Sequence, residues 1–245
     1  MKKFFNYVLD KPQFVLATAS DTSHYKSLKN FLKSAIKFES KSIIVVYDLG
    51  LSCDELTLLK SLYPSVIYKT FEFDNFPDYF NIRKNAGEYA WKPIIIDLVM
   101  KEFKCDVFWM DSGNILVSKL SKIKRFLYMY GFFSNFSQGT INDWTFSKTL
   151  AYMGVSKQIL NRRNLNGACI GFSYSNQTSM ELLKKWVECA LIKECIAPKG
   201  SNRSNHRQDQ AVLSVLAYQL NIVDELQKYI DLEKYYGFKI HQDVN

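Results

Sequence analysis

A single acidic residue at the end of an apolar run is the first candidate for chemistry in this sequence. In the stretch FWMDSG, residues 108–113, Asp111 follows three apolar side chains and precedes Ser112 and Gly113. These residue types favour turns, so one interpretation is a strand that simply leaves its sheet there. The other is a phosphate or metal site, because a carboxylate is a hard oxygen ligand and glycine lets a ligand approach the backbone.

Three further stretches contain polar side chains with a chemical use. Asp48 lies in VVYDLGLS, Lys92 in EYAWKP, and the pair Asp209 and Gln210 in RQDQAVLSVL. A lysine can neutralise a leaving phosphate, and one carboxylate within hydrogen-bond reach can act as a general base. Each also has a structural interpretation: Asp48 as a turn residue, Lys92 as a solvated helix lysine, and Asp209 as a helix cap.

The elements that must position these residues alternate between strands and helices in the first half of the chain. Apolar and β-branched runs predict strands, and apolar residues on one helical face predict helices. The predicted strands are 14–19, 42–47, 66–73 and 106–110, and the predicted helices are 24–38, 54–63 and 88–103. This alternation is typical of a mostly parallel α/β sheet, whose ligands bind beyond the carboxyl ends of the strands. Asp111 is therefore predicted to lie where such folds do chemistry.

The second half of the chain is less regular. Its patterns predict a helix and a strand within 121–133, a helical segment over 144–160, a strand over 167–173, and helices over 180–191 and 208–220. The segment 198–206, PKGSNRSNH, is the most loop-like part of the sequence. With 245 residues, of which 47% are hydrophobic, the chain can bury a sizeable core, and we expect one domain over 1–245.

The formal net charge of +8 restricts the class of partner. The basic residues are mostly dispersed, and only 119–125, 162–163 and 199–207 are locally basic. No nucleic-acid-binding motif accompanies the charge, so we expect no nucleic-acid partner. An anionic membrane surface or a nucleotide-linked substrate explains the same excess, and peripheral membrane association is one expectation.

Cysteine usage and the N-terminus both favour a cytoplasmic chain. The five cysteines are odd in number and scattered, without zinc-ligand spacing, which predicts reduced structural thiols. The first residues, MKKFFNYVLDKPQF, begin like a signal peptide with two lysines after the methionine. Polar residues interrupt the apolar part and no cleavage site follows, so we expect no signal peptide. The longest apolar runs are far shorter than the roughly 20 residues that a bilayer span requires.

Four of these stretches occur in one order along the chain: VVYDLGLS, EYAWKP, FWMDSG and RQDQAVLSVL. Together they resemble the GT-A type of nucleotide-sugar glycosyltransferase, in particular the family-eight-like transferases and related glycosyltransferase-like proteins. The resemblance covers about residues 14–220. It implies an α/β GT-A fold, a Rossmann-like mixed sheet flanked by helices, with a nucleotide-binding half over 14–116 and an acceptor-side half over 117–245.

The resemblance implies transfer of a sugar from a nucleoside-diphosphate sugar, with UDP favoured, to a hydroxyl of a glycan or glycolipid acceptor. Surface polysaccharide or lipooligosaccharide synthesis at the inner face of a bacterial membrane is the associated expectation. Two alternatives stay open. A sugar-phosphate nucleotidyltransferase has a similar nucleotide-binding half, although ATASDTS, residues 17–23, lacks the glycine-rich loop of that class. A non-catalytic glycosyltransferase-like binding module is the second.

Donor-binding residues follow from the same resemblance. It places the nucleotide base at the end of the first strand against a tyrosine, the diphosphate near the lysine and the FWMDSG turn, and the donor sugar beside an Asn-Gly pair. The implied residues are Thr18, Ala19, Ser20, Tyr25, Lys92, Asp111, Ser112, Gly113, Asn166 and Gly167. Tyr25 has the alternative of a helix residue packed on the sheet, and Asn166-Gly167 that of a β-turn before a core strand.

The resemblance also implies a divalent cation and a catalytic pair. Asp111 matches the first acid of the family's Asp-x-Asp motif, but Gly113 stands where the second acid is expected. One carboxylate with diphosphate and water holds Mn²⁺ or Mg²⁺ less tightly, and His241 is the candidate additional ligand, unless it is an ordinary surface histidine. Asp209 and Gln210 match the family's catalytic pair. In an inverting enzyme Asp209 is the general base, and in a retaining enzyme the pair positions the donor.

Overall fold

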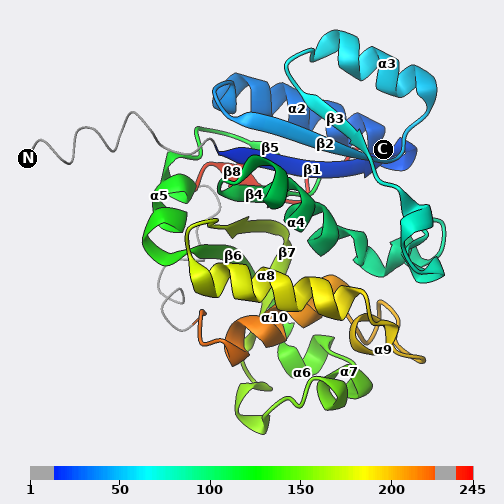
Figure 1. Ribbon diagram of the computed structural model, residues 1–245, viewed down its shortest axis with the longest axis vertical. Coiled ribbons are helices and arrows are strands. Elements are labelled where there is room, and N and C mark those ends of the chain that lie inside the picture. Colours follow the sequence, from blue (N-terminus) through cyan, green and yellow to red (C-terminus); the bar gives the residue numbers. More distant parts are fainter. Residues whose placement is uncertain (1–13, 224–235, 245) are drawn as a thin grey trace, which may run out of the picture.

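The computed structural model describes residues 14–223 and 236–244 of the chain. The expectation that no signal peptide is present depends on the N-terminal segment, most of which lies outside the described residues. Within the described part, a strand and helix alternation leads into a less regular second half (Figure 1).

A six-stranded mixed sheet forms the centre of the fold. Its strand order is β3-β2-β1-β4-β7-β6. In that order the strands are Ile67–Thr70, Ile43–Gly50, Val15–Asp21, Val107–Met110, Arg163–Phe172 and Phe132–Thr140. The first four are parallel, whereas β7 runs antiparallel to both β4 and β6. The predicted α/β class and mixed sheet are confirmed.

Burial explains why the central strands are continuous apolar runs. All four residues of β4 are buried, and six of the seven in β1 are buried, with Asp21 at the end partly exposed. Strands covered by helices on both faces have no solvent face, so they lack the alternation of a half-exposed strand. The edge strand β3 has no buried residue and is shorter than the predicted 66–73.

Helices cover the two faces of this sheet, as Figure 1 shows, with α8 passing across the front and α10 beside it. The longer helices are α2 (Tyr25–Glu39), α3 (Cys53–Leu62), α4 (Trp91–Phe103), α5 (Ser121–Tyr130), α8 (Gln177–Ala190) and α10 (Gln208–Gln219). Helix α2 buries one face, as its periodicity predicts. Helix α10 is buried along almost its whole length, which makes it an interior helix.

A short second sheet returns the C-terminal segment to the centre of the fold. Strand β5 (Ile115–Leu116) pairs antiparallel with β8 (Phe238–Lys239). Val244 N donates to Ser27 Oγ in α2, the helix that follows β1. Residues 240–244 therefore lie beside the turn that follows β4, more than a hundred residues earlier in the sequence.

Two segments differ from the predicted elements. The helix predicted over 88–103 begins at Trp91, because the backbone from Asn85 to Tyr89 is left-handed. The helical segment predicted over 144–160 is broken into α6 (Ile141–Trp144), α7 (Ser147–Tyr152) and a 3-10 turn. Gly154, with φ of +59°, follows α7 and ends it.

The prediction of five reduced cysteines is wrong for two of them. Cys189 and Cys195 form a disulfide that joins the end of α8 to α9 (Lys193–Ile196). The turn between these helices brings the two Cα atoms to 5.3 Å, which the sequence spacing alone does not reveal. In the described chain the other three cysteines, Cys53, Cys105 and Cys169, form no disulfide.

Candidate active site

The candidate site lies where the parallel strands β1 and β4 end side by side. The chain moves from β1 to β2 and β3 on one side, and β4 pairs on the other side. Such a switch point leaves a crevice at the carboxyl ends, where ligands of open α/β sheets bind. Two pockets open there, of about 370 Å³ and about 390 Å³, and we call them the first and second pocket. Tyr89, Asp111 and His241 line both, so the pockets adjoin at these side chains.

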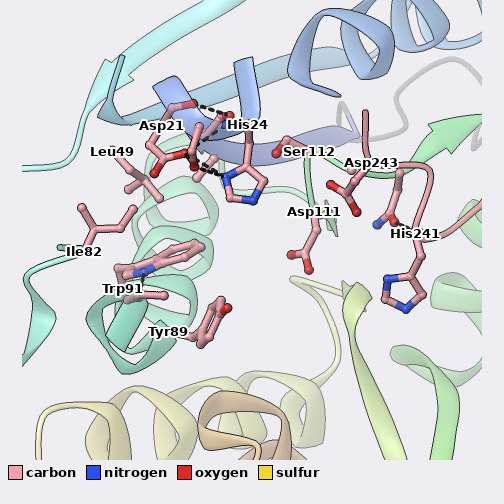
Figure 2. A pocket seen from close by; sticks show the side chains of 16 residues that line it. Asp21, His24, Leu49, Ile82, Tyr89, Trp91, Asp111, Ser112, His241 and Asp243 are labelled. Carbon is pink, nitrogen blue, oxygen red and sulfur yellow. Dashed lines mark hydrogen bonds and ion pairs between the residues drawn. The ribbon is translucent and has the colours of Figure 1, made fainter. Parts of the chain in front are cut away.

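The end of β1 supplies a hydrogen-bonded acid and histidine to the first pocket. Asp21 Oδ1 lies 2.8 Å from His24 Nδ1 and accepts a hydrogen bond of 2.6 Å from Ser23 Oγ (Figure 2). The bond to His24 lowers the pKa of Asp21 to about 2. The same bond raises the pKa of His24, and the carboxylates of Asp243 and Asp111 add to that rise. His24 therefore carries positive charge at higher pH than an ordinary histidine.

The turn after β4 is fixed to the neighbouring strand β7. Asp111 N donates to Ala168 O at 2.9 Å, and the buried Asn114 side chain donates to the same carbonyl at 2.8 Å. Trp109 Nε1 donates to Asp111 Oδ1 at 2.7 Å, so the indole of the strand orients the carboxylate that follows it. Asp111 thus reaches the junction of the pockets in a defined position, as its place after an apolar strand predicts.

Lys92 is a buried cation between two carboxylates. Its Nζ lies 3.2 Å from Asp111 Oδ1 and 3.0 Å from Asp209 Oδ2, and donates to Gly167 O at 3.0 Å. Burial by itself lowers the pKa of Lys92, but the two carboxylates outweigh it and the net pKa is raised. The side chain is only 4% exposed, so the interpretation of Lys92 as a solvated helix lysine is wrong.

Asp209 is buried at the start of α10 and faces the second pocket. Burial raises its pKa, Lys92 opposes that rise, and Asp111 adds to it. Its Oδ2 lies 3.0 Å from the Lys92 ammonium and is shielded from solvent. Trp186 Nε1 donates to the Asp209 carbonyl at 2.9 Å and holds the first turn of the helix in place.

Gly167 lies against the Asp209 carboxylate. A Cβ at this position would lie 3.3 Å from Asp209 Oδ2 and 3.3 Å from the Cβ of Gln210. Gln210 Oε1 accepts a hydrogen bond from Gly167 N at 3.4 Å. Gly167 and Asn166 lie inside β7, not in a turn that precedes a strand, so the β-turn interpretation is wrong. Glycine is used here because of the close approach of α10 to the strand.

A left-handed backbone segment presents Tyr89 to both pockets. Residues 85–89 all have positive φ, between 49° and 61°. Non-glycine residues in this region are strained by about 1 kcal/mol each and are found preferentially at functional sites. Trp91 Nε1 donates to Ala86 O at 2.9 Å, which ties the segment to the start of α4. Lys92 Nζ lies 5.6 Å from the centre of the Tyr89 ring, within cation–π range.

Most of the residues predicted from sequence line one pocket or both. Those in the first pocket are Ala19, Ser20, Asp111, Ser112, Gly113 and His241, and those in the second are Lys92, Asp111, Asn166, Gly167, Asp209, Gln210 and His241. Thr18 and Tyr25 line neither pocket. Thr18 is fully buried in β1, and the Tyr25 ring packs against the core from the start of α2. Asp48 accepts hydrogen bonds from Gly50 N and Leu51 N, as its interpretation as a turn residue predicts.

Several lining residues were not identified from sequence: Asp21, Ser23, His24, Tyr89, Arg203, Arg207 and Asp243. The two arginines belong to the locally basic segment 199–207, which was a usable signal. The Arg203 guanidinium bonds to the Tyr89 hydroxyl, and the Arg207 guanidinium lies 4.2 Å from the centre of the Trp144 ring. Both place positive charge at the second pocket.

The donor set of the first pocket suits a hard divalent cation. Asp111, Asp243, His241 and the hydroxyl of Ser112 line it, and Mn²⁺ and Mg²⁺ favour carboxylate oxygens, with imidazole accepted by Mn²⁺. Within residues 14–223 and 236–244, no three Asp, Glu, His or Cys side chains are already gathered as a complete metal site. The residues present therefore fit such an ion in chemistry, with further ligands required from a bound molecule or water.

Comparison with known proteins identifies the fold. The family described as "Protein of unknown function (DUF1647)" matches residues 2–97, and the search of curated proteins finds no significant match. Mouse xyloside xylosyltransferase 1 superposes with a TM-score of 0.51 and 10% identity, covering 85% of this chain and 82% of that one. The galactosyltransferase LgtC, in complex with donor and acceptor sugar analogues, gives 0.53 and 16%, covering 82% and 70%.

The Mn/GDP form of core-mannan synthase A from Aspergillus fumigatus gives a TM-score of 0.57 at 7% identity, covering 85% of this chain and 70% of that one. Other matched glycosyltransferases are longer, and the chain spans 55% and 38% of two of them. At these identities the likeness shows the fold alone. The chain has the GT-A fold of glycosyltransferases.

None of the helices in the described residues is both long enough and apolar enough to cross a bilayer.

Proposed function

We propose that this protein is a glycosyltransferase that moves a sugar from a nucleoside-diphosphate sugar to a hydroxyl of a glycan or glycolipid acceptor. The observation that carries the proposal is the ion-pair chain Asp111–Lys92–Asp209 at the junction of the two pockets, in which Lys92 and Asp209 are buried. It puts a fixed cation and a buried carboxylate at the point where a leaving diphosphate and an attacking hydroxyl would meet. The GT-A fold supports this use of the site.

The first pocket is the proposed site of the nucleotide. It lies at the carboxyl ends of β1 and β4 and is formed mainly by the proposed nucleotide-binding half, 14–116. Asp21, Ser23 and His24 offer acceptors, donors and an aromatic ring to a base or ribose. We keep UDP as the favoured nucleotide, and Ala19 and Ser20 as residues that approach it through the backbone of β1.

The second pocket is the proposed site of the transferred sugar and the acceptor hydroxyl. It is formed mainly by the acceptor-side half, 117–245, together with Tyr89, Lys92 and Asp111. Asn166, Gly167 and Gln210 line it beside Asp209. Arg203 and Arg207 bring positive charge to the same pocket, which suits an acceptor or donor with negatively charged groups.

Asp209 and Lys92 carry the proposed chemistry. A general base works best when its pKa is raised toward the working pH, and burial raises the pKa of Asp209 in this direction. In an inverting reaction the Asp209 carboxylate accepts the proton of the acceptor hydroxyl as the new glycosidic bond forms and the bond to the diphosphate breaks. In a retaining reaction Asp209 and Gln210 position the donor instead. In either case the Lys92 ammonium stabilises negative charge near the departing phosphate.

A divalent cation fits the proposed donor site. Asp111 and His241 are the residues predicted to hold Mn²⁺ or Mg²⁺, and both line the first pocket. When bound, the ion would neutralise charge on the diphosphate and favour its departure. The Mn/GDP form of a protein with the same fold supports this choice of ion.

The net charge and the disulfide bear on where the enzyme acts. The net charge of +8 supports peripheral contact with an anionic membrane and an acceptor made at a membrane surface, such as a lipid-linked saccharide of a bacterial surface polysaccharide. The Cys189–Cys195 disulfide argues against the cytoplasmic location expected from sequence, because disulfides persist mainly in oxidising compartments.

Release of nucleoside diphosphate tests the proposal and separates it from its alternatives. The purified chain is incubated with a panel of nucleotide sugars, with Mn²⁺ and with EDTA. The proposal predicts release of nucleoside diphosphate from at least one donor. Pyrophosphate release from a nucleoside triphosphate and a sugar phosphate would favour a nucleotidyltransferase. Nucleotide binding without turnover of any donor would favour a non-catalytic module, and absence of both would refute the transferase function.

A further inference from the structure

The turn after β4 lacks a second acid in sequence, but a carboxylate occupies that place in the structure. Gly113 stands two residues after Asp111, where the Asp-x-Asp pattern has its second acid. A Cβ built on Gly113 would overlap the carboxylate group of Asp243, which belongs to the C-terminal segment. Figure 2 shows Asp111, Asp243 and His241 on the same side of the first pocket.

Backbone pairing fixes Asp243 at this position. Gln242 N donates to Gly113 O at 2.7 Å, and His241 N donates to Asn114 Oδ1 at 3.0 Å. On the other side of Asp243, Val244 N donates to Ser27 Oγ at 3.0 Å. Because strands β5 and β8 hold the same segment upstream, the backbone at Asp243 is held by contacts on both sides of it.

Glycine at position 113 and an acid at position 243 are therefore complementary. Any side chain on residue 113 would displace the Asp243 carboxylate, since the two occupy the same space. The φ of Gly113 lies outside the left-handed region, so the backbone does not itself require glycine there. With the Asp243 carboxylate in its present position, there is no room for a Cβ on residue 113.

The charge of the first pocket requires a cation if a diphosphate binds. Its described lining contains the carboxylates of Asp21, Asp111 and Asp243, and no lysine or arginine; Lys92, outside this lining, pairs with Asp111. His24 is the one basic group in that lining with a raised pKa, and it is already paired with Asp21. A nucleoside diphosphate brings two to three negative charges by ordinary phosphate chemistry, which these carboxylates would repel. A bound divalent cation removes that repulsion.

We propose that Asp243 is the second carboxylate of a divalent-cation site, in which it acts with Asp111 and His241 in place of an acid at position 113. The inference rests on the proposed transferase function and specifies how this chain binds its donor. The three side chains are not gathered as a complete site in the described chain, so oxygens of the diphosphate and water supply the other ligands.

Binding of Mn²⁺ alone tests the assignment without any turnover. Free Mn²⁺ is measured by electron paramagnetic resonance during titration of the full chain, first alone and then with UDP. Asp243→Asn should weaken Mn²⁺ binding about tenfold or more. Changes to outer-shell partners of a metal already cost about 10–100-fold in affinity, and loss of a direct ligand should cost at least the lower of these values. Glu188→Gln, on the exposed face of α8, is the matched control and should bind as wild type.

A reciprocal exchange separates coordination from a general effect of the tail. Gly113→Asp alone should weaken Mn²⁺ binding, because the new side chain displaces Asp243. The double variant Gly113→Asp with Asp243→Gly should recover most of the affinity, since it restores one carboxylate at the same place. Thermal unfolding of each variant shows whether the fold is retained, and Asp243→Asn is exposed enough to be tolerated.

The outcomes are distinct from those of the activity assay. Wild-type Mn²⁺ affinity in Asp243→Asn would overturn the inference, as would a double variant that binds no better than Asp243→Asn. If Asp243→Asn binds UDP more weakly in EDTA but keeps its Mn²⁺ affinity, Asp243 acts through the charge of His24 and not on a cation. That result would also overturn the inference. Donor turnover that is unaffected by EDTA would refute the cation site but would leave the transferase function intact.

Discussion

Removal of the Lys92 ammonium is the most informative single perturbation of the site. Lys92→Met keeps the length and apolar stem of the side chain but leaves Asp209 buried beside Asp111 without a cation. Breaking a buried ion pair by removal of one partner destabilises a protein by about 3–5 kcal/mol, because the remaining charge stays desolvated. The lost hydrogen bond to Gly167 O belongs to the same change. We expect a loss of this size in the free energy of unfolding near neutral pH.

The pH dependence gives this prediction its sign. Burial and Asp111 raise the pKa of Asp209, and Lys92 is the group that opposes them, so its removal raises that pKa further. When the pKa of a carboxyl group is higher in the folded protein than in the unfolded protein, the protein loses stability as the pH rises from the unfolded-state pKa to the folded-state pKa. The deficit of Lys92→Met should therefore be smaller at about pH 5 than at about pH 8.

Urea denaturation of wild type, Lys92→Met and Lys92→Arg at both pH values measures the effect. Lys92→Arg keeps the charge in a larger side chain, so it separates loss of charge from misfit. A deficit below about 1 kcal/mol in Lys92→Met at about pH 8, or a deficit independent of pH, would refute the description of Lys92 as the cation that pairs with the buried Asp209 carboxylate.

Three further changes have definite expected results. Asp209→Asn should lower turnover by about 10²–10⁴-fold with nearly unchanged nucleotide affinity, measured by single-turnover kinetics and calorimetry; equal loss in affinity would contradict a role in the chemical step. Nucleotide affinity of the wild type should fall as the pH rises through the raised pKa of His24, and His24→Gln should flatten this dependence; an unchanged slope would rule out His24 as the titrating group. Replacing Cys189 and Cys195 with serine should lower the free energy of unfolding by about 2 kcal/mol, and equal stability would show that the short loop gains nothing from closure.

The order of elements could be predicted from sequence because burial leaves a direct mark on it. Strand β4 and the first residues of β1 and β2 are apolar runs, and α2 shows one apolar face. The placement of Asp111 at the junction of the pockets follows from that order, since parallel strands bring their carboxyl ends to one edge.

Local backbone geometry limited the prediction of individual site residues. A 3-10 turn at Thr22–His24 separates β1 from α2, so His24 faces the pocket and the neighbouring Tyr25 packs inward. The sequence offers two adjacent aromatic side chains and no pattern that distinguishes them. The pair Asn166-Gly167 was interpreted as a turn because of its composition, whereas the glycine in β7 reflects the approach of α10.

Tertiary contacts explain why the partners of Lys92 and the position of Asp243 could not be predicted from sequence. The apolar neighbours of Lys92 in the stretch YAWKPIII, residues 89–96, are a local signal of burial, and its partner acids lie near it only after folding. Asp243 lies at the end of the chain, and only the pairing of β5 with β8 brings it to Gly113. No sequence period connects positions separated by this distance.

Donor turnover by Asp111→Ala tests the central claim most directly. Wild type and variant are compared for release of nucleoside diphosphate across the panel of nucleotide sugars, after equal folding has been shown by circular dichroism. The two-pocket account predicts release by the wild type from at least one donor and none above background by Asp111→Ala. Release by the variant at the wild-type rate would contradict it, because the turn after β4 would then have only a structural role.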